Sequence, residues 1–296
     1  MTVTAYIRYT AWLASALALA LASGCAMLQL GYTHLDTWAA YRADEYFDLD
    51  AQQRQEFRAR FERLHEWHRR EQLRDYAAFL SEARSRIHQQ PRREDVLWIA
   101  EGLKARYRVI VRRMNADAAA LLSTLKPEQI NALQRQWDDD NRKFIRERGI
   151  RAARDERQRV RAERATDEIR KWVGNLAPEQ ERRVAALSDA VPTISELRLQ
   201  ERMRRQREFR ELLESAAQPD FAPRLERFLV DWESGRSPEY ERALTAWWDK
   251  RIDYFVAVYQ ILTPQQRAAL DGRLQDYVED FLKLAERSPG RAAGNP

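Results

Sequence analysis

The histidines are the residues of this sequence whose types and spacing come nearest to supporting catalysis. His65 and His68 lie three residues apart, and Glu62 precedes His65 by three, which forms one Glu-x-x-His motif. A di-iron site in a helical bundle needs two such motifs on separate helices, and a zinc protease needs two histidines four residues apart. Neither His34 nor His88 completes such a set. We therefore predict no metal site and expect partly buried, hydrogen-bonded histidines.

Cys25 is the only cysteine in the sequence, and the residues before it have the features of a secretion signal. Residues 1–24 carry one charge, on Arg8, and an apolar run, Ala11–Ala22, that is too short to span a bilayer as a helix. The run leads into Leu21-Ala22-Ser23-Gly24-Cys25, which is typical of a lipobox. Lipidation there would add a diacylglycerol and an N-acyl chain such as palmitate, enough for stable anchoring. We predict a signal peptide over 1–24, lipid attachment at Cys25 and a short tether over 25–32.

An ordinary secretory signal, cleaved near Ala22 or Gly24 and leaving Cys25 as a free thiol, is the alternative interpretation. In lipoproteins of enteric bacteria an aspartate after the cysteine retains the protein at the inner membrane, and here Ala26 follows instead. We therefore expect a membrane-anchored protein of the cell envelope, on the periplasmic face of the outer membrane if the source is Gram-negative. Its expected partners are the membrane, through Cys25, and a protein partner or polypeptide client, with no nucleic acid.

The composition excludes several classes of function. One-third of the residues are charged, but the formal net charge is only +5, too small an excess to indicate nucleic-acid binding. With one cysteine no intrachain disulfide can form, so stability must come from packing. The sequence has no glycine-rich phosphate loop and no nucleophile elbow. We therefore predict a non-enzymatic protein with no catalytic residues and no cofactor.

Prolines and apolar periodicity divide the chain into helices. Proline is tolerated in the first turn of a helix and damaging in its interior, and the segments between prolines carry apolar residues at three- and four-residue spacing. No segment alternates as a strand would. We predict an all-α, elongated multi-helix bundle over 33–286, as one domain or two lobes, with a disordered tail over 287–296. The expected helices are 33–47, 51–87, 93–124, 127–173, 178–190, 193–216, 222–234, 238–261 and 264–286.

A Leu-x-x-x-Gln motif occurs four times, each time at an expected helix start. The copies are Leu49 with Gln53, Leu125 with Gln129, Leu176 with Gln180, and Leu262 with Gln266. Asp50 and Thr263 are good capping residues, and a glutamine three residues after a cap can reach back to its backbone N–H. Lys126 and Ala177 are poor caps. We interpret the motif as four convergent helix starts, with a functional repeat as the alternative.

The middle of the chain is unusually charged, with twelve basic and six acidic residues in 141–171. We predict one long helix over 127–173, reaching ~70 Å, with Gly149 and Gly174 as its weak points. A helix that is polar on all sides bridges packed bodies or is largely solvated. Four arginines share one of its faces and form a candidate anion-binding surface for lipid headgroups, lipopolysaccharide or acidic segments, with a solvated charged face as the alternative. They are Arg154, Arg157, Arg161 and Arg164.

The start of the expected mature chain resembles a family of uncharacterised proteobacterial lipoproteins that carries a domain-of-unknown-function label. The resemblance rests on Leu30-Gly31-Tyr32, on Tyr46-Phe47-Asp48-Leu49 and on Trp67-His68-Arg69-Arg70-Glu71-Gln72-Leu73. It extends over nearly the whole chain after Cys25. It implies helices, a lipid anchor and no assigned activity.

The proline-containing copies of the repeated motif are also similar to the Leu-Thr-x-x-Gln signature of the Spy/CpxP periplasmic chaperones. The match is fullest in Leu262-Thr263-Pro264-Gln265-Gln266. This resemblance implies binding of unfolded polypeptide. We therefore expect an envelope lipoprotein with a helical binding or structural role, and keep a chaperone and a scaffold for envelope assembly as alternatives.

Overall fold

The computed structural model describes residues 28–286, and these residues form helices joined by short turns, with no strand among them. The predicted all-α, multi-helix fold is confirmed. Cys25, the signal segment and the expected tail over 287–296 lie outside the described residues.

A helical stretch over 28–33 precedes the first labelled element, so most of the predicted tether is helical. Four later helices begin at a proline, as the sequence predicts. No helix within 28–286 is both long and apolar enough to cross a membrane. In chain order the elements are α2 (Leu35–Phe47), α3 (Ala51–Trp67), the π-helix η1 (His68–Gln72), α4 (Leu73–His88), α5 (Arg93–Leu122), α6 (Pro127–Glu147), α7 (Arg154–Val173), α8 (Pro178–Asp189), α9 (Ser195–Glu214), α10 (Phe221–Val230), α11 (Pro238–Ile261) and α12 (Pro264–Glu286).

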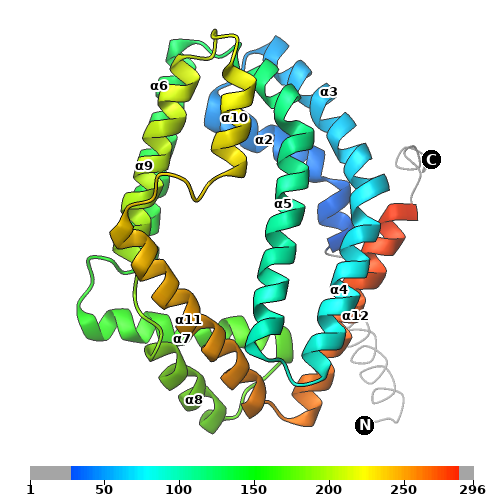
Figure 1. Cartoon of the computed structure of the whole chain (residues 1–296), viewed down its shortest axis with the longest axis vertical. Helices are drawn as coiled ribbons and strands as arrows, with labels where there is room; N and C mark the ends of the chain where they lie inside the picture. The colour runs from blue at the N-terminus through cyan, green and yellow to red at the C-terminus, as the bar shows by residue number, and fades with distance from the viewer. Residues whose placement is uncertain (1–27, 287–296) are drawn as a thin grey trace, which may run out of the picture.

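The helices are arranged as a closed frame (Figure 1). Helix α9 packs against both α10 and α11, and each of these also packs against α5, which closes a circuit of four helices. Along one edge of the frame α4 and α12 lie side by side, and along the opposite edge α6 pairs with α9. Helices α7 and α8 pack together at the end of the frame crossed by α11.

Two separate hydrophobic clusters stabilise this frame. One is formed by α7, α8, α11 and the turns beside them, and its buried residues include Val184, Tyr254 and Val258. The other is formed by α5, α6, α9 and α10, with Leu133 and Leu225 almost completely buried. Burial of a large aliphatic side chain contributes about 1.5–3 kcal/mol, so each cluster holds its own set of helices together.

The prediction of one helix over 127–173 is wrong. Helix α6 ends at Glu147 and α7 begins at Arg154, with Gly149 between them at a φ of +59°. Glycine reaches this left-handed conformation without the steric cost that a side chain brings, and it commonly ends helices. Helix α6 belongs to one hydrophobic cluster and α7 to the other. The charged segment therefore joins the two clusters through a turn instead of spanning them as a rod.

Candidate functional site

The four repeated glutamines come together in two pairs. Gln53 and Gln129, at the starts of α3 and α6, donate to each other: Gln53 Nε2 lies 3.2 Å from Gln129 Oε1, and Gln129 Nε2 lies 2.7 Å from Gln53 Oε1. Each Oε1 also accepts from the backbone N–H of its own cap, at 3.0 Å from Asp50 and 2.9 Å from Lys126. Each amide thus caps its own helix and binds the other helix start.

The second pair repeats this geometry at the starts of α8 and α12. Gln180 and Gln266 exchange hydrogen bonds of 2.7 and 3.0 Å, and their Oε1 atoms accept from the backbone N–H groups of Ala177 and Thr263. The cap predicted at Thr263 is present, because its Oγ1 accepts from the Gln266 N–H at 3.2 Å. Asp50 caps Gln53 in the same way at 3.0 Å.

Each glutamine also donates to a backbone carbonyl before its partner's helix. Gln53 Nε2 donates to Thr124 and Gln129 Nε2 to Asp48, while Gln180 Nε2 donates to Ile261 and Gln266 Nε2 to Asn175. In every case the carbonyl lies five residues before the partner glutamine. The helix-start interpretation is therefore correct for all four copies and incomplete, because the motif also joins helices that are distant in sequence.

His65 and His68 lie in an aromatic cluster between residues 28–33, the N-terminal segment, and the consecutive helices α3, η1 and α4, which together form the α3–α4 rod. Tyr32 Oη is 2.9 Å from His68 Nδ1, and Tyr76 Oη is 3.2 Å from His68 Nε2. A neutral imidazole donates from one nitrogen and accepts at the other, so one ring serves both hydroxyls. The Tyr32 ring also packs against His65 at 4.5 Å, and Phe281 of α12 packs against Tyr76 at 5.9 Å.

Burial dominates the electrostatics of this cluster. It lowers the pKa of His68 from its ordinary 6.5 to about 4, with a further contribution from His65. It also lowers the pKa of His65, and raises the pKa of Tyr76 to about 12 and that of Tyr32 still further above its ordinary value. All four groups are therefore neutral near pH 7. A proton donor or acceptor for catalysis near neutral pH needs a pKa near that pH, and burial moves the pKa values of His68, Tyr32 and Tyr76 well away from it.

The π-helix η1 begins at His68 and places the histidine between the two tyrosines. Its backbone closes a wider turn, with the Leu73 N–H donating to the His68 carbonyl. Single π-turns inside α-helices occur frequently at functional sites. Glu62 is exposed, and no group of three histidine, cysteine or acidic side chains within 28–286 is arranged to hold a metal ion. The spacing of His65 and His68 marks both histidines in the sequence, whereas no local pattern indicates Tyr32 or Tyr76.

A second contact joins the N-terminal segment to the body. Gln29 Nε2 donates to Asp280 Oδ1 at 2.7 Å, and Asp280 in α12 is 1% exposed. Together with Tyr32, this contact explains why residues 28–33 are helical rather than an extended tether. The segment that begins three residues after Cys25 is thus attached to α3 and α12.

The four arginines of the predicted anion-binding face lie on α7 but differ in their contacts. Arg161 donates to the Asp189 and Val191 carbonyls at 3.0 and 2.9 Å, and so holds the C-terminal end of α8. Arg157 lies 3.8 Å from a carboxylate oxygen of Glu196 in α9. Among the described residues, only Arg154 and Arg164 of this face have no ion pair or hydrogen bond. The face does not present four free arginines.

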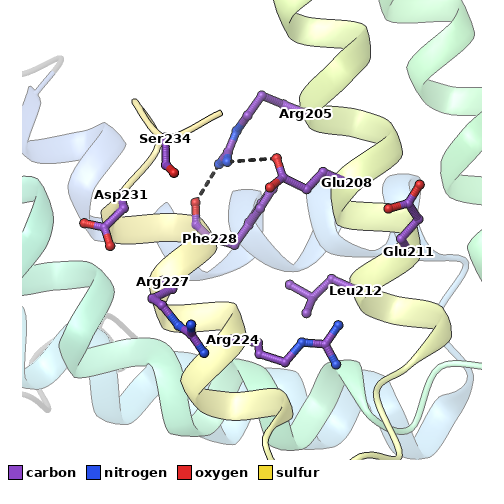
Figure 2. A pocket seen from close by; sticks show the side chains of 9 residues that line it. All are labelled: Arg205, Glu208, Glu211, Leu212, Arg224, Arg227, Phe228, Asp231 and Ser234. Carbon is purple, nitrogen blue, oxygen red and sulfur yellow. Dashed lines mark hydrogen bonds and ion pairs between the residues drawn. The ribbon is translucent and has the colours of Figure 1, made fainter. Parts of the chain in front are cut away.

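A surface pocket of about 480 Å³ lies between α9 and α10 (Figure 2). Arg205 occupies one side of it, donates to the Phe228 carbonyl at 2.7 Å and pairs with Glu208 at 3.5 Å. Three arginines and three acidic residues line the pocket, so its charges balance and do not select a ligand of one sign. The lining residues are Arg205, Glu208, Glu211, Leu212, Arg224, Arg227, Phe228, Asp231 and Ser234.

The fold and its buried contacts define an all-α protein whose helix starts are joined by two glutamine pairs. The chain matches the family of unknown function DUF6279 over residues 45–241 and belongs to that family. The matched segment runs from the end of α2 to the start of α11 and includes three of the four paired glutamines. Comparisons with curated proteins and with solved structures gave no significant match.

Proposed function

We propose that this protein is a lipid-anchored, non-enzymatic component of the cell envelope that acts by binding through its helical surfaces. The observation that carries the proposal is the apolar run ending in Ser23-Gly24-Cys25. The fixed attachment of Gln29 and Tyr32 to the body supports it, because an anchor at Cys25 would then hold the frame close to the membrane. The neutral histidine cluster and the charge-balanced pocket favour binding over catalysis.

The outer membrane is the proposed location if the source is Gram-negative. This part of the proposal rests on Ala26, which stands where an aspartate retains lipoproteins of enteric bacteria at the inner membrane. Density separation of the two membranes tests it. Wild type should fractionate with the outer membrane, and Ala26→Asp should move the protein to the inner membrane. Equal distribution of both forms would contradict the location but not the anchor.

The anchor itself is tested by labelling with palmitate. Wild type should incorporate the label and sediment with membranes, whereas Cys25→Ser should accumulate as an unprocessed, unlabelled precursor. Ser23→Ala keeps a small residue beside the cysteine and serves as the matched control, which should be processed like wild type. If Cys25→Ser matures and fractionates as wild type does, the lipid anchor is excluded.

Chaperone-like binding of unfolded polypeptide is the weaker candidate. The glutamines that resemble the chaperone signature are engaged in pairs, and Gln53, Gln129 and Gln266 are buried. A client could reach them only if the helix starts opened. The exposed apolar residues of α5, Leu97, Leu103 and Val109, are also six residues apart and point in three directions around the helix. An aggregation assay with a denatured client should therefore show little protection by wild type.

A further inference from the structure

Large apolar side chains are exposed on the first helical segment of the body. Leu30, Trp38 and Tyr41 are 57%, 60% and 65% exposed, and His34 between them is exposed as well. Single exposed apolar residues are common on protein surfaces, but a contiguous group marks a binding surface. We name Leu30, His34, Trp38 and Tyr41 the N-terminal stripe.

Two of these residues, Trp38 and Tyr41, share one face of α2, and His34 stands at its start. Helical hydrogen bonding is interrupted at His34, the N-cap of α2, whose φ of −102° and ψ of 15° are not helical; its N–H donates to Leu30 and its carbonyl accepts from the Trp38 N–H, both at 3.1 Å. At about 100° per residue, Trp38 and Tyr41 lie about 60° apart within α2, whereas Leu30 belongs to the helical stretch before the cap. The face carries no charge until Glu45, which pairs with Arg42.

The body holds the stripe in a fixed orientation. Gln29 and Tyr32 attach the segment to α12 and to the α3–α4 rod, as described above. At the other end of α2 Ala43 is buried, and Tyr46 donates to Asp140 of α6. Contacts at both ends of the segment therefore keep the stripe exposed while its other side is packed.

Chain length places this stripe near the proposed anchor. Leu30 follows Cys25 by five residues, and five residues span at most ~18 Å even when fully extended. From Leu30 to Tyr41 the stripe covers twelve residues, and its part from His34 to Tyr41 spans ~11 Å at about 1.5 Å per residue. If Cys25 is inserted in a bilayer, the stripe cannot lie far from the surface of that bilayer. Tryptophan and tyrosine are the side chains that favour this boundary, since each has an apolar ring and a polar group.

We propose that the N-terminal stripe lies in the interface of the membrane that holds Cys25, and so orients the frame on that membrane. This inference rests on the proposed lipid anchor. The stripe has no lysine or arginine, and Arg42, one turn after Trp38, is paired with Glu45. The surface therefore suits the uncharged part of the interface, and binding does not need anionic lipid.

The test uses the full-length lipidated protein in phosphatidylcholine vesicles. Cys25 is the only natural cysteine and is blocked by its lipid in the proposed form, so an added cysteine can be labelled alone with an environment-sensitive fluorophore. Tyr41→Cys places the label in the stripe. Trp248→Cys places it on an exposed apolar position of α11, a helix well separated from α2 in Figure 1, as the matched control.

The label at position 41 should show blue-shifted emission and quenching by a nitroxide on the lipid acyl chains, and the label at 248 should show neither. Trp38→Asp added to Tyr41→Cys should reduce the quenching several-fold. If the protein floats with the vesicles but the two labels are equally exposed to water, the stripe does not contact the membrane and the anchor stands. If the protein carries no lipid on Cys25 and does not float, the proposed function and this inference both fail. Quenching only with anionic lipid would contradict the uncharged interface.

Discussion

Gln180 and Gln266 stand 86 residues apart in sequence, and each amide nitrogen donates to the oxygen of the other. The same two oxygens accept from the caps of α8 and α12. Removal of either side chain therefore leaves a backbone N–H without its partner and breaks a tertiary contact at the same time.

Gln266→Ala should destabilise the protein by about 1–3 kcal/mol, because a hydrogen-bonded group left unpaired in a buried site costs this much. The adjacent Gln265→Ala is the matched control, since Gln265 is exposed, and should change the free energy of unfolding by no more than about 0.5 kcal/mol. Urea denaturation measures both. The double variant Gln180→Ala with Gln266→Ala should cost less than the sum of the single changes. Strict additivity would contradict the pairing.

Stability should fall in mild acid because of His68. Burial lowers its folded-state pKa from 6.5 to about 4, so the folded state favours the neutral ring. The stability that the lowered pKa of His68 contributes is fully present above pH 6.5. It is lost as the pH falls toward 4, because over this range His68 binds a proton more readily in the unfolded chain than in the folded protein. Urea midpoints at several pH values should decrease over this window in wild type and less steeply in His68→Gln. His88→Gln, at an exposed histidine, should keep the wild-type slope.

Replacement by alanine should change the stability of the protein in opposite directions at two glycines. Gly149→Ala should cost about 1 kcal/mol, because alanine is strained at the left-handed backbone of the α6–α7 turn. Gly272→Ala, in the interior of α12 with open space around an added methyl group, should stabilise by about 0.5–1 kcal/mol. Thermal melts of the two variants compare them directly. Stabilisation by Gly149→Ala would indicate that α6 and α7 are one continuous helix.

Substitution of Arg161 and of Arg164 distinguishes a structural role of this face of α7 from anion binding. Arg161→Ala should destabilise by about 1–3 kcal/mol, since it leaves the carbonyls at the end of α8 without donors. Arg164→Ala, which removes an unpaired arginine from the same face, should have little effect on stability. Binding of both variants to anionic vesicles gives the second readout. If both variants lost vesicle binding equally and kept their stability, the predicted anion-binding surface of four arginines would be supported.

The helices were predictable because their signals are local. Prolines mark the starts of α6, α8, α11 and α12, and apolar periodicity continues from each of them. The break at Gly149 had a local signal, but the charge pattern on both sides is helical and outweighed one glycine.

Contacts between distant residues were not predictable in the same way. The caps at Gln53 and Gln129 follow from residues three positions apart, whereas their mutual contact joins positions 76 residues apart. Tyr32 likewise approaches His68 only because the segment packs on the α3–α4 rod. Local spacing holds no information on such contacts, so the sequence indicated the four glutamines and the two histidines but not the residues that they contact.

The position of α12 sets the order in which this chain can fold. Arg84 of α4 forms a two-bond ion pair with Asp271 of α12, 187 residues later, and α12 also supplies the partner of Gln180. Because a chain is synthesised N-terminus first, the face of α4 that packs on α12 stays uncovered until nearly all of the chain has been made. During that interval the chain is vulnerable to proteases and to aggregation. Arrival of α12 ends this interval, because α12 packs on both α4 and α7.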